Sequence, residues 1–322
     1  MWLFKISRLA RLIWVLGCFC VCLSTQAQTH NPTGSAPRAI WMWEADTYAM
    51  LAHEAVATQH IAFLKEKGIT TLYLYADAYE GQSKILNQAF QYERLIKRLH
   101  RERFQVYALL GSWYLKTWRY VLPEERSKAR RMFQQVLDYN ASVNVDAQFD
   151  GVNLDIEPHM LEEWDSQKHQ LLWQWLELSH DLMKLKQVSQ QGLKVGPAMP
   201  FWLDGISIDW HGQLKPASQH LQDVYDYVAL MDYRDRAEGG DGMISHAANE
   251  MAYAQSIDKE LVIGIETGPN EIQKVSFNHL QEAEMERELS KVEQAYAGQR
   301  AFRGFVIHHF GTYKRWLQHG LN

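Results

Sequence analysis

Short apolar runs alternate with longer amphipathic stretches along most of the chain. The apolar runs are rich in branched and aromatic residues, as buried strands are, and the stretches between them repeat apolar positions with the period of a helix. The predicted strands span residues 39–45, 70–77, 104–113, 149–158, 194–203, 227–233, 260–267 and 303–310. The predicted helices span residues 48–67, 86–103, 123–144, 162–190, 246–257, 280–296 and 313–318, and residues 204–226 have no clear period.

This alternation of strand and helix predicts an α/β fold with a parallel sheet, because parallel neighbours need crossover connections. Eight repeats are the number that closes into a (β/α)8 TIM barrel. The alternative is an open doubly wound sheet, which normally carries a glycine-rich loop after its first strand. Here the strand residues Ile40–Glu44 run into residues 45–47 with no glycine. We therefore expect a single-domain barrel over residues 39–322, with its active site at the C-terminal ends of the strands.

The first residues have a different character. Basic residues precede the apolar run Leu12–Leu23, and small residues end at Ala27. The run is shorter than the roughly 20 residues that span a bilayer, so residues 1–28 are predicted to be a secretory signal peptide and residues 29–38 a polar lead. The segment Val15–Cys18 offers a lipoprotein cleavage site as an alternative. Either interpretation places the protein outside the inner membrane, in the periplasm or the extracellular space.

Charge and cysteine content exclude several classes of function. Lys and Arg total 33 against 38 Asp and Glu, a net charge of −5, with no basic block. We therefore expect no nucleic-acid partner and no membrane contact beyond the signal peptide. All 3 cysteines lie within that peptide, at Cys18, Cys20 and Cys22, so the mature chain has no thiolate nucleophile. Metal-binding motifs are also missing from the sequence, so we expect no metal and no cofactor. We also expect the protein to be a monomer.

The most informative segment is the end of the fourth predicted strand, where polar and branched apolar residues alternate. Asn153, Asp155 and Glu157 share one strand face, and the apolar residues between them share the other. In a barrel the apolar face meets the helices and the polar face meets the lumen. Polar groups in a lumen are costly unless they are hydrogen-bonded or used.

Asp155 and Glu157 are expected to interact strongly. Their Cα atoms are about 6.6 Å apart along a strand, and repulsion between two such charges is on the order of 3 kcal/mol, or roughly two pKa units. One carboxyl group should therefore stay protonated near neutral pH. Glu157 lies nearer the rim and is the candidate general acid. Because both groups approach a sugar from one side, the nucleophile must be another carboxylate, a water, or a group on the substrate such as a 2-acetamido oxygen.

The segment from Asp150 to Glu157 resembles the Asp-Gly-x-Asp-x-Asp-x-Glu signature of glycoside hydrolase family 18, the chitinase and endo-N-acetylglucosaminidase family. The departure is Asn153, where that family usually carries an Asp. Met231-Asp232-Tyr233 is similar to the family's Met-x-Tyr-Asp motif, with Arg234 in place of the final Asp. The segment ending at His308 is similar in spacing to the one that usually delivers a Trp to the floor of the sugar site.

The resemblance implies retaining, substrate-assisted hydrolysis of a β-linked glycan that contains N-acetylglucosamine. Glu157 would protonate the leaving oxygen, and Asp155 would orient the acetamido group and stabilise it as an oxazolinium forms. Tyr233 would hydrogen-bond that group, and Asn153 would hold Asp155 as a neutral partner. The family also includes non-catalytic, lectin-like barrels, so glycan binding without cleavage is the alternative from another class.

A rival mechanism rests on Glu266, which ends the seventh predicted strand. Retaining glycosidases of another large clan resemble this arrangement, with an acid Glu after strand four and a nucleophilic Glu after strand seven. That clan usually carries an Asn before its acid, where this chain has Ile156. A requirement for a 2-acetamido group in the substrate would separate the two mechanisms.

Further contacts to an oligosaccharide are expected along the rim. Aromatic rings suit the C–H faces of pyranoses, and polar side chains suit their hydroxyls. The candidates are Asn153, Trp43, Trp113, Trp202, Asp77, Asp232, Glu266 and His308. The glycine-rich stretch 239–242 is expected to be a flexible rim loop that can close over the substrate.

Overall fold

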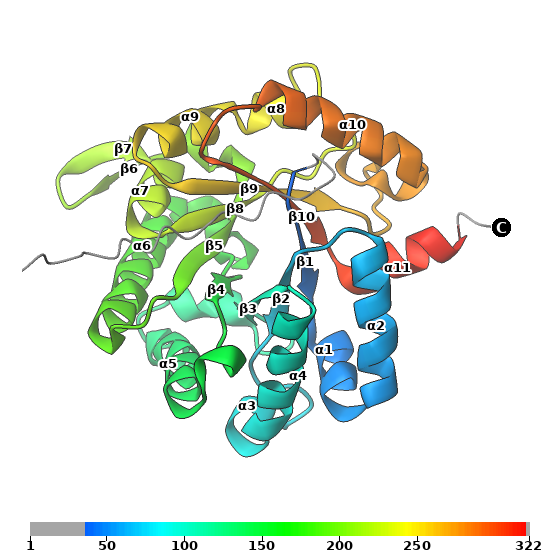
Figure 1. Cartoon of the computed structure of the whole chain (residues 1–322). Helices are drawn as coiled ribbons and strands as arrows, with labels where there is room; N and C mark the ends of the chain where they lie inside the picture. The colour runs from blue at the N-terminus through cyan, green and yellow to red at the C-terminus, as the bar shows by residue number, and fades with distance from the viewer. Residues whose placement is uncertain (1–35, 320–322) are drawn as a thin grey trace, which may run out of the picture. The chain divides into compact units, whose positions relative to one another are not determined.

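The computed structural model describes residues 36–319. Eight parallel strands form a closed barrel in the order β1-β10-β9-β8-β5-β4-β3-β2, with β1 beside β10 (Figure 1). The barrel strands are β1 (Arg38–Met42), β2 (Thr71–Tyr75), β3 (Gln105–Leu110), β4 (Gly151–Leu154), β5 (Lys194–Pro200), β8 (Tyr227–Met231), β9 (Glu260–Glu266) and β10 (Phe302–His308). The predicted TIM barrel is confirmed. The predicted signal peptide lies outside the described residues.

Helices connect the strands on the outside of the barrel (Figure 1). They are α1 (Glu44–Ala52), α2 (Glu54–Glu66), α3 (Lys84–Asn87), α4 (Ala89–Arg101), α5 (Arg126–Ser142), α6 (Trp164–Ser189), α7 (Ala217–Val224), α8 (Met243–His246), α9 (Ala248–Ser256), α10 (Glu282–Ala295) and α11 (Phe310–His319). Between residues 36 and 319, no helix has the length and apolar character that crossing a membrane requires.

The stretch without clear period, residues 204–226, contains regular structure after all. It forms the hairpin β6 (Ser207–Trp210) and β7 (Gln213–Pro216), followed by α7. The hairpin turn consists of His211 and Gly212, with φ of +50° and +79°. Two consecutive positive φ values fit the tight turn that joins twisted antiparallel strands. The hairpin is too short for its alternation of polar and apolar residues to stand out in the sequence.

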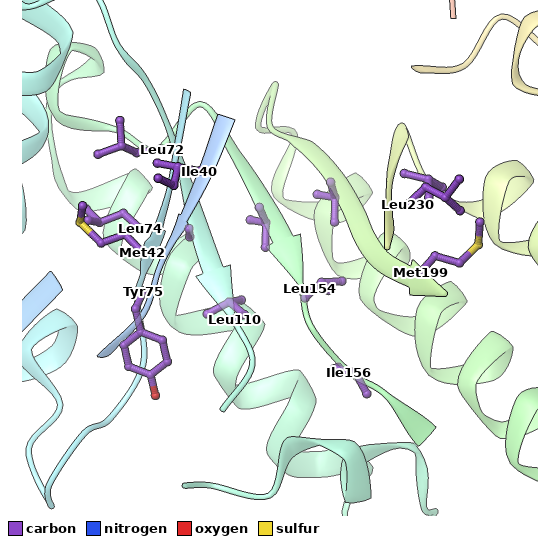
Figure 2. Packing of buried hydrophobic residues seen from close by; sticks show 14 of the residues in the cluster. Ile40, Met42, Leu72, Leu74, Tyr75, Leu110, Leu154, Ile156, Met199 and Leu230 are labelled. Atoms are coloured by element: carbon purple, nitrogen blue, oxygen red, sulfur yellow. The ribbon is translucent and has the colours of Figure 1, made fainter. Parts of the chain in front are cut away.

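The main hydrophobic core lies between the barrel and its helices. Apolar side chains at alternate strand positions, among them Ile40, Leu72, Leu110 and Leu154, are buried there (Figure 2). Ile156 continues this pattern beyond the end of β4 and is also buried. Because side chains alternate along a strand, the intervening residues of β4 face the lumen.

A second, smaller core fills the lumen itself. Its largest members are the buried rings of Trp41, Tyr73, Tyr107 and Tyr227. Tyr107 packs so closely on β4 that a Cβ on Gly151 would lie 2.6 Å from its ring. These rings form a packed floor, so a ligand can enter only the C-terminal end of the barrel, above them.

Candidate active site

The centre of the site is the carboxyl pair that follows β4. The backbone N–H of Asp155 donates to the carbonyl of Leu110 over 2.7 Å, which continues the pairing with β3 past the last β4 residue. This register keeps Asp155 and Glu157 on the lumen side, while Ile156 packs toward the helices. Both carboxyl-bearing residues are half-buried, and the Glu157 side chain is 27% exposed. The pair therefore stands on the barrel floor and is open to a ligand from above.

Burial makes these two groups weak acids. Burial raises the pKa of Asp155 to about 6, with His308 opposing the shift and Glu44 adding to it. Burial raises the pKa of Glu157 to about 8, and the charge of Asp155 contributes to that shift. Near neutral pH, Glu157 therefore holds a proton while Asp155 is ionised. This is the arrangement in which one group can donate a proton and its neighbour can stabilise positive charge.

Glu44 reaches the pair from the end of β1. Its Oε1 accepts a hydrogen bond from Oγ of Ser112 over 2.7 Å. Ser112 follows Gly111, and a Cβ on Gly111 would lie 2.4 Å from Cβ of Asp155. The ends of β3 and β4 therefore approach each other closely only because residue 111 has no side chain.

Asn153 has a different place from the one expected. Its side chain is fully buried, and its Oδ1 accepts from the indole N–H of Trp41 over 2.8 Å. Its Nδ2 donates to the hydroxyl of Tyr227 over 3.3 Å. Within residues 36–319, no hydrogen bond joins Asn153 to Asp155, and burial leaves no surface for a substrate. The expected roles of Asn153 as partner of Asp155 and as substrate contact are therefore corrected: it ties the aromatic floor together.

On the opposite side of the barrel, a hydrogen-bonded chain joins three side chains: Trp43 after β1, His308 at the end of β10 and Glu266 at the end of β9. Nε1 of Trp43 donates to Nε2 of His308 over 3.3 Å, and Nδ1 of His308 lies 2.7 Å from Oε2 of Glu266. Because Nε2 accepts, the network assigns the ring proton to Nδ1, which donates to Glu266. The imidazole is thereby fixed in orientation at the position where the resembled family usually has a Trp.

Glu266 is held as an anion. Its Oε1 accepts the backbone N–H groups of Thr267 and Gly268 over 2.7 and 2.5 Å. Burial alone would raise the pKa of Glu266, but the hydrogen bond from His308 and those backbone donors lower it overall. Both carboxylate oxygens therefore already have donors, and the most direct role of Glu266 is to orient His308.

Tyr233 lies just after β8, where its ring faces that of His308 at a centroid distance of 5.7 Å. Burial, together with the charges of Glu266, Glu157 and Asp155, raises the pKa of Tyr233 well above its ordinary value. Its hydroxyl therefore keeps its proton and remains a hydrogen-bond donor among three carboxyl groups. Side chains from β4, β8, β9 and β10 thus converge on one space above the floor.

His159 belongs to this site and was missed from the sequence. Its Nε2 lies 3.6 Å from Oε1 of Glu157, too far for a hydrogen bond. Its ring packs edge-on against Trp202 at 5.5 Å, and Trp202 packs against Trp164 at 5.8 Å. Burial lowers the pKa of His159 to about 4, so it is neutral beside the acid. Its position two residues after Glu157 was the available signal, but a turn at residues 158–160 is needed to bring it back.

The other predicted contacts lie apart from this centre. Asp232 is fully buried with Oδ1 3.0 Å from Nδ1 of His246, so it cannot touch a substrate and the expected contact is corrected. Asp77 is almost as buried, and its Oδ1 accepts from the backbone of Ala78 over 2.7 Å. Trp113, by contrast, is 72% exposed, with its ring 4.7 Å from that of Trp118. It offers a free aromatic face after β3.

In the described part of the chain, no group of three or more His, Cys, Asp or Glu side chains has the geometry to hold a metal ion. The functional groups of the site are carboxyl groups, histidines and aromatic rings. Their arrangement can donate a proton, stabilise a developing cation and hold a ring between aromatic faces.

Solved structures with a similar fold include chitinases. A GH18 chitinase from Cycas revoluta in complex with allosamidin matches with a TM-score of 0.52 at 12% identity, over 88% of this chain and 97% of that chain. A mutant of a GH18 chitinase from the same organism, in complex with (GlcNAc)4, matches with a TM-score of 0.51 at 12% identity over the same shares. A GH18 chitinase from Flavobacterium johnsoniae has 16% identity and a TM-score of 0.49, over 86% of this chain and 89% of that chain.

No family model matches the sequence, and no curated protein matches it. At these identities the two Cycas revoluta structures establish that the chain shares their fold. The predicted resemblance is therefore confirmed as a resemblance of fold.

Proposed function

We propose that this protein is an exported glycoside hydrolase that cleaves a β-linked, N-acetylglucosamine-containing glycan by retaining, substrate-assisted hydrolysis. The observation that carries the proposal is the pair of Glu157, protonated near neutral pH, and Asp155, ionised beside it, at the C-terminal end of the barrel. The charges of both carboxyl groups act on the hydroxyl of Tyr233 and contribute to raising its pKa, so that it stays protonated. A proton donor, a stabilising anion and a neutral hydrogen-bond donor are the three groups that this reaction requires.

The shared fold supports the substrate class. Two Cycas revoluta chitinase structures of that fold were determined with (GlcNAc)4 and with allosamidin. An oligosaccharide substrate for this chain is the corresponding proposal. The exposed ring of Trp113 would stack on a sugar unit outside the reacting one.

In the first step, Glu157 gives its proton to the glycosidic oxygen while the 2-acetamido oxygen of the substrate attacks the anomeric carbon. The bond to the leaving sugar breaks, and an oxazolinium ion forms. Asp155 stabilises its positive charge, and the hydroxyl of Tyr233 orients the acetamido group. A water then attacks the same carbon and gives its proton to the Glu157 carboxylate, which restores the acid and retains the anomeric configuration.

The rival nucleophile, Glu266, is less well supported. Its two carboxylate oxygens already accept from two backbone N–H groups and from His308. Three of its roughly four acceptor positions are thereby occupied, so only one lone pair, on Oε2, is left to attack a sugar. Its hydrogen bond to His308 instead supports a role in presenting the imidazole to the substrate.

The proposal is tested by mass spectrometry of products from matched N-acetylated and de-N-acetylated β-linked oligosaccharides. Cleavage of the acetylated set alone supports substrate assistance. Equal cleavage of both sets would contradict it and favour Glu266 as the nucleophile. Binding of the acetylated set without cleavage, measured by calorimetry, would contradict hydrolysis and indicate a lectin-like protein.

The pH dependence of kcat/KM should be bell-shaped, with an acid limb near pH 6 and an alkaline limb near pH 8, because kcat/KM reports the ionisation of the free enzyme. Asp155 must be ionised, so activity is lost as the pH falls through its raised pKa. Glu157 must be protonated, so activity is lost as the pH rises through its own. Initial rates across pH 4–10 would measure both limbs. A substrate whose leaving group needs no proton is the control, and an alkaline limb that persists with it would contradict the assignment of Glu157.

A further inference from the structure

We propose that Asp241, on the loop after β8, is a positioning residue that holds Tyr233 in place through Arg234 and His246. The inference rests on the proposed function of Tyr233 and extends it to a residue outside the site. It follows from the contacts of the two residues that flank Tyr233, both of which lead to the same carboxylate.

The residue after Tyr233 is fixed by its side chain. Nη1 of Arg234 donates to the backbone carbonyl of Tyr233 over 2.7 Å. Nε of the same guanidinium donates to Oδ1 of Asp241 over 2.9 Å. The orientation of the Tyr233 carbonyl, and hence the direction of its side chain, is therefore coupled to Asp241 through one rigid planar group.

The residue before Tyr233 is tied to the same place. Asp232 is fully buried, and its Oδ1 lies 3.0 Å from Nδ1 of His246. The other ring nitrogen of His246, Nε2, lies 3.3 Å from Oδ1 of Asp241. One carboxylate oxygen of Asp241 thus faces the groups that hold both neighbours of Tyr233.

The other carboxylate oxygen of Asp241, Oδ2, contacts two further basic side chains. Nζ of Lys274 lies 2.8 Å from Oδ2 and Nη2 of Arg236 lies 3.3 Å from it. Hydrogen bonds from Lys274 and Arg234 lower the pKa of Asp241 well below its ordinary value. The carboxylate is therefore ionised throughout the working range and balances a group of positively charged side chains that would otherwise repel each other.

Phe201, just after β5, supports the side chains of Arg234 and His246 from one side. The ring of His246 stacks on Phe201 at 4.1 Å with an interplanar angle of 7°. The guanidinium of Arg234 lies 5.1 Å from the same ring centroid. Both intermediaries between Asp241 and Tyr233 therefore rest on one aromatic side chain, which limits their movement.

This arrangement also corrects the expectation of a freely closing loop at residues 239–242. Ionic contacts bind its Asp241 to groups on three other segments of the chain. Gly242 packs against its own loop, since a Cβ there would lie 2.4 Å from the carbonyl of Glu238. The loop therefore holds the residues around Tyr233 in place through the contacts of Asp241.

The variant Asp241→Asn keeps the size of the side chain and removes its charge. We expect kcat to fall by about tenfold with little change in KM, because a small displacement of a positioned group acts mainly on the reacting geometry. Asp223→Asn is the matched control. Asp223, on α7, is as exposed as Asp241, at 36% against 33%, and pairs with Lys215 on β7, away from Tyr233.

The decisive comparison is a double-mutant cycle with Tyr233→Phe. If Asp241 acts through Tyr233, the double variant loses no more activity than Tyr233→Phe alone. Losses that multiply would overturn the proposal, as would an Asp223→Asn control that loses as much as Asp241→Asn.

A crystal structure of Asp241→Asn separates this proposal from the proposed function. If the Tyr233 hydroxyl moves relative to Glu157 in this variant, the positioning proposal is supported. Unchanged activity in Tyr233→Phe would count only against the proposed catalytic role of Tyr233. An unmoved Tyr233 overturns the positioning proposal whatever the kinetics show.

Discussion

Replacing Glu157 by glutamine should lower kcat on β-linked N-acetylglucosaminides by a factor on the order of 10³. Glutamine has nearly the same shape but no proton to give to the leaving oxygen. The loss should appear in kcat, with KM little changed, since the amide still fills the space beside His159. Steady-state rates on a soluble oligosaccharide would measure it.

The same variant should fold at least as well as the wild type. Folding raises the pKa of Glu157 from 4.5 to about 8, so the folded protein loses stability as the pH rises between these two values. The neutral amide has no such charge to bury. Thermal melts at pH 6 and pH 9 would therefore show a smaller drop for Glu157→Gln than for the wild type.

Glu266→Gln is the matched comparison, because it makes the same substitution across the lumen. We expect a smaller loss, with the change arising from a misoriented His308. The opposite outcome is a loss of kcat as large as that of Glu157→Gln, with turnover restored by azide and a product of opposite anomeric configuration. That result would establish Glu266 as the nucleophile.

Replacing Gly111 by alanine should lower kcat by about a hundredfold and reduce Tm by roughly 5 °C. The new Cβ would lie 2.4 Å from Cβ of Asp155 and 2.5 Å from its carbonyl oxygen. Neither atom belongs to a flexible side-chain end, so the ends of β3 and β4 must separate. Asp155 would then move away from the acetamido group that it has to stabilise.

The control for this variant is Gly192→Ala, since nothing lies within 4 Å of a Cβ at Gly192. Kinetics and melting curves of both variants would be compared with those of the wild type. Full activity in Gly111→Ala would show that the close approach of the two strands does not set the position of Asp155.

The fold was predictable because its signal is repeated along the chain. Each barrel strand alternates with helical sequence, and the closed barrel has the predicted eight strands, arranged around the barrel in their order along the chain. The hairpin at residues 207–216 was missed because its alternation extends over strands of only 4 residues each. Helix boundaries also moved: α1 begins at Glu44, immediately after β1, which brings that carboxylate to the site.

The barrel and the lumen face of Asp155 and Glu157 could be predicted from the sequence, because side-chain alternation is a local property of one strand. The hydrogen-bond partners of Asn153 and His308 could not be predicted, because they come from distant segments of the chain. The amide of Asn153 bonds to Trp41, 112 residues away, and His308 pairs with Glu266 on the next strand of the barrel. Such contacts depend on how separate strands are staggered when the barrel closes, which no single stretch of sequence encodes.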